Sequence, residues 1–266
     1  MDDTIQHGWE IIRFDEGALS FEDDTVATEY PLTVVLNGEE FATMVCSPTN
    51  LQELLIGFLA SEGIIRFFDD ILSIQIDEAQ GFAYIELKKP LEKEQHDHSK
   101  RFIGSCCGKS RQFYFKSDVK TAKTVVSRLT ITISQAFALM EQLQFESEHF
   151  QRTGGVHNAA LCTPDDMLTV RTDIGRHNVL DKIYGNILEN KIRLVDKLIV
   201  FSGRLSSEVL LKISKIGVGI IISKSAPTDL ALRLANDLGI TTVGFARGNK
   251  MNVYTHPHRI YEATKK

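Results

Sequence analysis

From about residue 154 to its C-terminus, the sequence alternates between short apolar runs and runs with the spacing of amphipathic helices. MLTVRT, KLIVFSG, VGIIIS and ITTVGFA are typical of strands, whereas HNVLDKIYGNIL, SSEVLLKISKIG and PTDLALRLANDLG are typical of helices. GVHNAALC, at the start of this region, is assigned to a further helix. Because continuously apolar strands that alternate with helices are covered on both faces, the pattern predicts a layered α/β sheet with helices on its faces.

The first hundred residues predict a smaller α+β domain. In YPLTVVLNGEEFATMVC, two apolar runs meet at Asn37-Gly38, a pair that suits the positive φ angles of a hairpin turn. Strands are therefore expected at 31–36 and 41–46. Leucine and phenylalanine residues at helical spacing predict a helix after SPTN, and ILSIQID and GFAYIELK predict two further strands.

The residues between 88 and 101 are polar and charged without periodicity, so a linker or surface loop is expected there. We therefore divide the chain into three parts. An N-terminal α+β domain is expected at 1–100, a connecting segment with two adjacent cysteines at 101–133, and an α/β domain at 134–266.

Two helix starts are expected at polar residues. Thr49 with Gln52 resembles a capping box, and Ser134 is expected to cap the helix QAFALMEQLQ. In that helix Phe137, Met140 and Leu143 are three residues apart, which is typical of a stripe that faces the core.

Composition argues against several classes of protein. The 266-residue chain has a net charge of -5, which provides no general attraction for nucleic acid or anionic lipid. No uninterrupted apolar run approaches the roughly 20 residues of a membrane span. The acidic N-terminus lacks the basic and apolar regions of an export signal, so a cytoplasmic protein is expected, with its four cysteines mostly as thiols.

Three polar segments, RTDIGRHNVLDK, FSGRLSSEVL and SKSAPTDLAL, follow strands or begin helices of the second half. Ligands of open α/β sheets bind outside the carboxyl ends of the strands, where helix N-termini present N–H groups, so these segments are expected to line one crevice. Their cations and hydroxyls suit phosphate or pyrophosphate, although each hydroxyl taken alone is explained as a helix cap. The candidate residues are Arg176, His177, Lys182, Ser202, Arg204, Ser206, Ser207, Lys224, Ser225 and Thr228.

His157, in RTGGVHNAAL, is a further candidate because the two preceding glycines allow a ligand to approach the backbone. Taken alone, such a histidine is expected to be a hydrogen-bonded structural residue. Zinc deaminases use His-x-Glu with a later Cys-x-x-Cys, but Asn158 and Ala159 follow His157 and the chain has no Cys-x-x-Cys. No tightly bound metal is therefore expected. The phosphate-binding fingerprints of ATPases and dinucleotide-dependent dehydrogenases are missing as well.

Cys106 and Cys107 are adjacent in GSCCGKSR. Adjacent Cα atoms lie about 3.8 Å apart, whereas an unstrained disulfide needs about 4.4 to 6.8 Å, so the two are poor partners for each other. No histidine or further cysteine stands beside them to complete a zinc site. The basic, glycine-rich setting would stabilise a thiolate that accepts sulfane sulfur and passes it on, and burial as inert packing residues is the competing interpretation.

The sequence as a whole resembles the formate dehydrogenase accessory sulfurtransferases, the FdhD family of sulfur carriers. The matching segments run in order from about 31 to 260: PLTVVLNGEEFATMVCSPTNLQELLIGFLASEGII, SCCGK, TGGVHNAAL, DIGRHNVLDK, SGRLSSE, SAPTDLA and VGFARGNKMNVYTHPHRI. The resemblance implies that a cysteine desulfurase donates sulfur to form a cysteine persulfide. It also implies that this sulfur passes to the molybdenum bis(molybdopterin guanine dinucleotide) cofactor, Mo-bisMGD, before the cofactor enters the formate dehydrogenase apoenzyme.

The same resemblance implies a cytidine-deaminase-like α/β fold without zinc for the second half, and a homodimer. The sulfur-accepting cysteine falls on Cys106 or Cys107. Many members carry Cys-x-x-Cys here, and a gap-free match at CGK aligns Cys107 with the second family cysteine and Gly104 with the first. We expect Cys107 to carry the persulfide and Cys106 to assist it. The cofactor-contacting segment falls on Phe245, Ala246, Arg247, Gly248, Asn249 and Lys250.

Two other functions are left open by the sequence. A non-catalytic chaperone of the molybdenum cofactor would bind the dinucleotide and the apoenzyme while its cysteines only pack. A phosphate-binding metabolic enzyme would need an acid or a base in the crevice, for which Asp173 with His177 is the pair to nominate. Asp173 is otherwise explained as the N-cap of the helix that contains GRHNVLDK.

Overall fold

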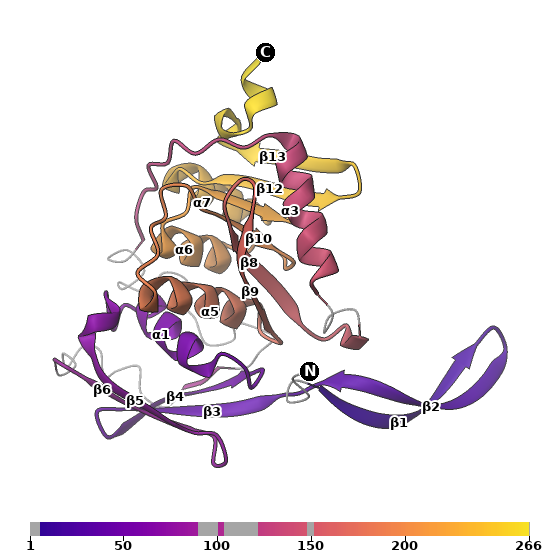
Figure 1. Cartoon of the computed structure of the whole chain (residues 1–266), viewed down its shortest axis with the longest axis vertical. Helices are drawn as coiled ribbons and strands as arrows, with labels where there is room; N and C mark the ends of the chain where they lie inside the picture. Colours follow the sequence, from indigo (N-terminus) through magenta and orange to yellow (C-terminus); the bar gives the residue numbers. More distant parts are fainter. Residues whose placement is uncertain (1–5, 90–100, 104–121, 148–151, 266) are drawn as a thin grey trace.

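The structure is a computed structural model that describes residues 6–89, 101–103, 122–147 and 152–265. Cys106 and Cys107 lie outside these ranges, as do most residues of the expected linker. The described strands form three sheets, and helices pack on two of them (Figure 1).

The second half contains the strands β8 (His157–Cys162), β9 (Met167–Asp173), β10 (Leu198–Phe201), β11 (Ile220–Ser223), β12 (Thr241–Arg247) and β13 (Lys250–Thr255). They form one six-stranded sheet in the order β13-β12-β11-β10-β8-β9. β10, β11 and β12 are parallel, whereas β13 runs antiparallel to β12, β8 to β10, and β9 to β8.

Helices cover both faces of this sheet. They are α3 (Ile133–Phe145), α5 (Arg176–Glu189), α6 (Ser207–Ile216) and α7 (Asp229–Leu238). Successive strand residues point to opposite faces, so Leu161 packs beneath α5, α6 and α7 whereas Cys162 packs beneath α3 (Figure 1). The predicted mixed α/β fold with helices on the faces of a sheet is confirmed, while the cytidine-deaminase-like layering stays a prediction.

The helix predicted for GVHNAALC is wrong, because this run forms strand β8. Its residues pair with β10 on one side and with β9 on the other, and four consecutive residues from Ala159 to Cys162 are fully buried. Alanine has a high intrinsic preference for helices, but tertiary contacts can override it. Here the backbone hydrogen bonds to a strand on each side make this run a strand. The remaining strands and helices predicted for this half are confirmed.

The first half contains β1 (Gln6–Asp15), β2 (Ala18–Ala27), β3 (Tyr30–Leu36), β4 (Glu39–Cys46), α1 (Leu51–Ser61), the short 3-10 helix η2 (Phe68–Asp70), β5 (Ile71–Asp77), β6 (Phe82–Leu87) and β7 (Arg101–Ile103). Five of these strands form a sheet in the order β5-β6-β3-β4-β7. The expected turn between β3 and β4 is confirmed, with φ angles of 51° at Asn37 and 82° at Gly38. Residues 101–103 were expected in the connecting segment, but they pair with β4 in this sheet.

Strands β1 and β2 form a hairpin that the sequence analysis did not predict and that extends away from the rest of the chain (Figure 1). Ile12 lies opposite Phe21 and Phe14 opposite Leu19, so these four side chains share one face. All four are exposed, from 63% for Ile12 to 83% for Phe21. A two-stranded hairpin with an uncovered apolar face has little stability of its own.

Two of the expected helix caps are corrected by the structure. α1 begins after Asn50, which has a left-handed backbone and no capping side chain, so Thr49 and Gln52 form no capping box. Thr132 caps α3 together with Gln135, two residues before the expected Ser134. The C-terminal 3-10 helices are η4 (Pro257–Arg259) and η5 (Tyr261–Lys265). None of the helices in the described ranges is long and apolar enough to span a lipid bilayer.

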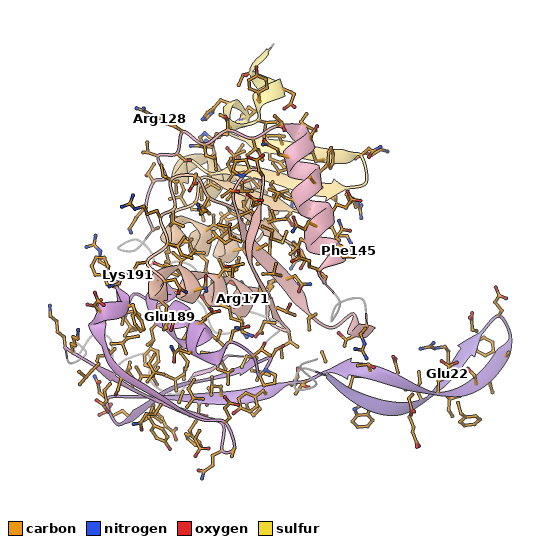
Figure 2. The ribbon with its side chains drawn as sticks, viewed as in Figure 1. Glu22, Arg128, Phe145, Arg171, Glu189 and Lys191 are labelled. Carbon is orange, nitrogen blue, oxygen red and sulfur yellow. The ribbon has the colours of Figure 1, made fainter. Side chains whose placement is uncertain are left out.

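The two halves meet where α1 crosses α5 in close contact (Figure 1). A Cβ atom on Gly57 of α1 would lie 1.8 Å from the carbonyl oxygen of Asp181, and one on Gly185 of α5 would lie 1.9 Å from that of Glu53. Only glycine permits this approach, because both obstacles are backbone atoms that cannot rotate away. Next to the crossing, Glu53 forms a two-point ion pair with Arg171 of β9, which is labelled in Figure 2.

A buried polar network joins the same two halves at the end of β9. The Nζ atom of Lys182 lies 2.8 Å from Oδ2 of Asp173, and both side chains are fully buried. Asp173 also accepts from the backbone N–H groups of Ser47 and Gly175. Lys182 donates in addition to the carbonyl oxygens of Ser47 and Thr172. The pair therefore connects the chain just after β4 to the turn that begins α5.

We expect Gly185→Ala to destabilise the protein although alanine is the better helix former. The added methyl group collides with the backbone of α1, and overpacking of this kind costs about 1–3 kcal/mol or more. Urea denaturation measures the loss. Gly8→Ala is the control, because no atom lies within 4 Å of the added Cβ there. Equal stability of the two variants would contradict the close contact.

We expect Asp173→Asn to lower the free energy of unfolding by about 3–5 kcal/mol, because it leaves the charge of Lys182 buried without a counter-charge. The matched control is Asp229→Asn, which removes one partner of the exposed Asp229–Arg233 pair and should change the free energy by less than about 1 kcal/mol. Denaturant unfolding of both variants compares them. A loss for Asp173→Asn as small as that of the control would contradict this account.

Candidate functional site

The polar segments predicted from the sequence lie at one edge of the six-stranded sheet. The parallel strands β10 and β11 end there and lead into α6 and α7. β8 begins at the same edge, because its second residue after His157, Ala159, is paired with Phe201 at the end of β10. β9 ends there too, because its last residue, Asp173, is paired with His157. We call this the polar edge. It contains the ends of β9, β10, β11 and β12 and the start of β8.

Hydrogen bonds connect neighbouring segments of the polar edge. The backbone N–H of Ser202 donates to the carbonyl oxygen of Asn158 over 2.9 Å, and the N–H of Asn158 donates back to the Ser202 hydroxyl over 2.9 Å. The Ser225 hydroxyl donates to the Ser202 carbonyl oxygen over 2.9 Å, and the Phe245 N–H donates to the Ser225 carbonyl oxygen over 3.2 Å. The loops after β10 and β11 are thus bonded to each other and to β12.

Two predicted hydroxyls act as helix caps. Ser206 accepts from the N–H of Val209 and caps α6, and Thr228 accepts from the N–H of Ala231 and caps α7. Ser207 is the first residue of α6 and is half-buried. Because a helix N-terminus carries partial positive charge, α6 and α7 both present a favourable end to an anion at the polar edge.

The two histidines of the polar edge are largely buried. Burial, and then the charge of Arg176, lower the pKa of His157 below its usual value. Burial also lowers the pKa of His177, whose Nε2 lies 3.1 Å from Oε2 of Glu208 in the first turn of α6. Both imidazoles are therefore neutral at physiological pH and can offer one donor and one acceptor each.

Of the four predicted cations, three can face a ligand and one cannot. Arg176 lies at the start of α5, and its buried Nε atom has no hydrogen-bond partner. Arg204 is exposed and Lys224 is half-buried. Lys182 is a correction, because its charge is fully buried against Asp173 and cannot face a ligand.

Asp173 also differs from the sequence-based expectation. Gly175, not Asp173, is the N-cap residue of α5, although Asp173 accepts the N–H of Gly175 over 2.7 Å. Its carboxylate is fully buried against Lys182, so no acid from Asp173 is presented beside His177. The nominated acid–base pair of a metabolic enzyme is therefore not assembled.

The predicted cofactor segment comprises the end of β12, the two-residue turn at Gly248 and Asn249, and the first residue of β13. Arg247, Gly248 and Asn249 line a cavity of about 510 Å³ together with residues of α3, and we call it the turn cavity. Phe245 has a left-handed backbone with φ 54°, and its ring lies 5.8 Å from the Arg247 guanidinium carbon. Lys250 is exposed, whereas Ala246 is fully buried in the core beneath α3.

The α3 side of the turn cavity was not predicted. It is lined by Phe137, Met140, Glu141, Gln144 and Phe145. Phe145, at the end of the helix, is 82% exposed (Figure 2). Of the predicted core stripe Phe137, Met140 and Leu143, the last two are buried as expected, whereas Phe137 is half-buried and lines the cavity. The sequence did contain a pattern that could have indicated this side of the cavity. Residues 137, 141, 144 and 145 share one helical face, and that face mixes aromatic and polar residues.

The two cysteines in the described ranges lack the features of a reactive thiolate. Cys46 and Cys162 are buried thiols, and burial raises the pKa of each to about 12. Cys106 and Cys107, the predicted sulfur acceptors, lie outside the described residues. Within the ranges that the structure covers, no group of three or more His, Cys, Asp or Glu side chains is arranged to hold a metal ion.

Comparisons with known proteins place these segments in a family. Three curated relatives, each named "Sulfur carrier protein FdhD", align over nearly their full length. The protein from Bacillus subtilis is 56% identical over 98% of this chain and 100% of its own. That from Halalkalibacterium halodurans is 57% identical over 100% and 99%, and that from Staphylococcus aureus strain MRSA252 is 52% identical over 99% of each.

A solved structure has a similar fold. It is described as a putative formate dehydrogenase accessory protein from Desulfotalea psychrophila, and it superposes with a TM-score of 0.80 over 96% of this chain and 99% of its own, at 24% identity. The family model of the FdhD/NarQ family matches residues 27–261, which include the polar edge and the turn cavity. The chain therefore belongs to the FdhD/NarQ family.

Proposed function

We propose that this protein is a sulfur carrier that accepts sulfane sulfur from a cysteine desulfurase and transfers it to Mo-bisMGD for formate dehydrogenase. The names of the curated relatives support a sulfur carrier, and the description of the similar structure supports a role beside formate dehydrogenase. The observation that carries the acceptor side of the proposal is the turn cavity, which joins the predicted cofactor segment to an exposed aromatic ring on α3.

The first chemical step is a transfer between two sulfur atoms. The Cys107 thiolate attacks the outer sulfur of the desulfurase persulfide, so a new S–S bond forms on Cys107 while the donor's S–S bond breaks. The donor cysteine leaves as a thiolate. Cys106 is proposed to assist Cys107.

The second step releases the Cys107 thiolate and leaves the sulfur on the molybdenum centre of the acceptor. The sulfur travels formally as a neutral atom, so its conversion to sulfide takes two electrons, supplied by the metal centre or by an external dithiol. The protein's own contribution is to hold the acceptor where the persulfide can reach it.

The turn cavity has the chemistry that a guanine base needs. Guanine presents N–H donors on one edge, and the carboxylate of Glu141 can accept two hydrogen bonds side by side. Phe137 and Phe145 provide rings on which the base can stack. Arg247 on the facing turn is placed to pair with a phosphate next to the base.

The polar edge supports binding of the pyrophosphate groups. The helix N-termini of α6 and α7 meet there, and the unpartnered Nε of Arg176 is a donor that a phosphate oxygen would satisfy. Neutral His157 can add a donor without the need for protonation, whereas the single N–H of neutral His177 faces Glu208. Arg204, Ser207 and Lys250 are proposed as further contacts.

Other parts of the proposal concern fold and assembly. The strand order and the helices on both faces support a cytidine-deaminase-like layering of the second half. The exposed apolar face of the β1–β2 hairpin supports a homodimer, because self-association would cover it. A cytoplasmic location and direct contact with the formate dehydrogenase apoenzyme complete the proposal.

A non-catalytic cofactor chaperone is the second candidate, favoured by the fact that the turn cavity and the polar edge are built without any cysteine in the described ranges. The double variant Cys106→Ala/Cys107→Ala separates the two functions. A carrier loses activation of formate dehydrogenase but keeps cofactor binding, whereas a chaperone keeps both.

We expect Cys107→Ala to abolish persulfide formation. Intact-mass measurement after incubation with a desulfurase and cysteine should show a gain of about 32 Da in the native protein and in the control Cys162→Ala, whose thiol is buried, but not in Cys107→Ala. Peptide mapping assigns the site. If Cys107→Ala, Cys106→Ala and the double variant all keep a cyanide-releasable sulfur, the carrier proposal is wrong.

We expect GDP to bind the turn cavity more tightly than ADP, because guanine presents two adjacent N–H donors to the Glu141 carboxylate, whereas adenine presents one donor beside an acceptor. Glu141→Gln should weaken GDP binding about tenfold, which corresponds to about 1.4 kcal/mol, and Arg247→Ala by a similar factor. Isothermal titration calorimetry measures both. Glu146→Gln is the control, because Glu146 lies five residues further along, at the C-cap of α3, and does not line the cavity. Equal GDP affinity in all four proteins would place the base elsewhere.

A further inference from the structure

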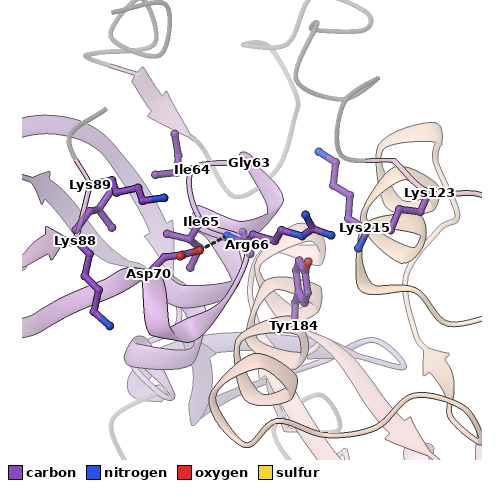
Figure 3. Close-up of a pocket in the computed structure, with 12 residues that line it drawn as sticks. Gly63, Ile64, Ile65, Arg66, Asp70, Lys88, Lys89, Lys123, Tyr184 and Lys215 are labelled. Atoms are coloured by element: carbon purple, nitrogen blue, oxygen red, sulfur yellow. Dashed lines mark hydrogen bonds between the residues drawn. The ribbon is translucent and has the colours of Figure 1, made fainter. Parts of the chain in front are cut away.

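A second cavity, of about 550 Å³, lies away from the polar edge, where the end of α1, the end of β6 and the middle of α5 approach the end of α6 (Figure 3). We call it the lysine cavity. Among the described residues, its lining consists of Ala60, Gly63, Ile64, Ile65, Arg66, Asp70, Leu87, Lys88, Lys89, Lys123, Tyr184 and Lys215. Its volume lies within the range of small-molecule sites.

The charge of the lysine cavity is strongly one-sided. Four exposed cations line it, namely Arg66, Lys88, Lys89 and Lys123, and the buried Lys215 adds a fifth. In the described part of the chain, no carboxylate forms an ion pair with any of the four exposed cations. A chain with a net charge of -5 thus concentrates positive charge at one concave place.

The one acid among the described lining residues, Asp70, offsets only part of this charge, because backbone hydrogen bonds lower the pKa of its carboxyl most and Lys88 and Lys89 contribute less. Oδ2 of Asp70 accepts the backbone N–H groups of Arg66 and Phe67, at 2.8 and 2.9 Å. The carboxylate therefore holds the turn after α1 in place. Lys215 has a structural role too, since its Nζ donates over 2.6 Å to the carbonyl oxygen of Ser61 near the end of α1.

The wall of the lysine cavity offers more than charge. Ile64, Ile65 and Leu87 give it an apolar part. The ring of Tyr184 stands between Arg66 and Lys215, with its hydroxyl toward that side of the cavity (Figure 3). Burial raises the pKa of Tyr184, so the hydroxyl stays protonated and can donate a hydrogen bond. Cations, a neutral donor and an apolar wall together match a phosphate group carried on an organic molecule.

The lysine cavity is distinct from the polar edge. Tyr184 lies eight residues after Arg176 along α5, and Lys215 lies eight residues after Ser207 along α6. At 1.5 Å of rise per residue, each separation is about 12 Å. α5 and α6 therefore begin at one site and reach the other further along.

We propose that the lysine cavity binds a dianionic phosphate group, held by Arg66, Lys88, Lys89 and Lys123 and by the Tyr184 hydroxyl. The group is either free inorganic phosphate or the phosphate of a small molecule whose apolar part contacts Ile64, Ile65 and Leu87. This is a second anion site, independent of the proposed transfer of sulfur to the cofactor.

Calorimetric titration of the full chain with inorganic phosphate and, separately, with phenyl phosphate tests the proposal. We expect binding of at least one of the two, weakened about tenfold or more in Arg66→Ala and in Lys88→Gln/Lys89→Gln. Tighter binding of phenyl phosphate identifies an organic phosphate, and equal affinity identifies the free anion. The substituted side chains are exposed, so folding should be unchanged, and thermal melting checks this.

Two control variants locate the site. Arg233→Gln removes an exposed cation that pairs with Asp229, and Lys191→Gln removes an exposed cation that pairs with Asp69; neither cation lines the lysine cavity. Neither should change phosphate binding. The proposal is overturned if neither ligand binds up to about 10 mM, if the lysine-cavity variants bind as the native protein does, or if either control variant weakens binding as much as they do.

Discussion

The buried ion pair between Lys182 and Asp173 connects the N-terminal half of the chain to the polar edge. Because an uncompensated charge at this depth would cost several kcal/mol, the pair holds the turn between β9 and α5 together with the backbone of Ser47. That turn places Arg176 and His177 at the start of α5. The geometry of the polar edge therefore depends on a contact between the halves.

The crossing of α1 and α5 adds a second constraint of a different kind. Gly57 and Gly185 allow the helix backbones to touch, and the ion pair of Glu53 with Arg171 lies beside them. The close backbone contact and the ion pair beside it can both form in only one orientation of α1 relative to α5 and β9. The linker expected from composition near residue 88 therefore does not imply that the two halves move freely.

Most of the fold follows from the hydrophobic pattern, and the exceptions have physical reasons. GVHNAALC has no strand signal of its own, because its conformation depends on pairing with β9 and β10. Loop positions after strands predicted the polar edge, but no pattern shows that Lys182 turns inward to Asp173, nine residues earlier. Only one side of the turn cavity was predicted. The FARGNK segment matched the family, but Phe137 and Glu141 lie on a helix whose pattern was explained by its core residues. The segment with Cys106 and Cys107 lies outside the described residues, so their chemistry still rests on the sequence.

The two proposed anion sites lie at opposite ends of α6, one where helices begin and the other where helices end, and this explains their different composition. At the polar edge, helices α6 and α7 present N-termini whose N–H groups and partial positive charge attract an anion with few cationic side chains. At the lysine cavity, α1 and α6 end, and their carbonyl groups carry partial negative charge. An anion is disfavoured there unless side chains reverse the sign of the potential. Lys215 offsets the end of α1 through its bond to Ser61. The four exposed cations exceed what the helix ends require, and that excess favours a ligand over dipole compensation alone.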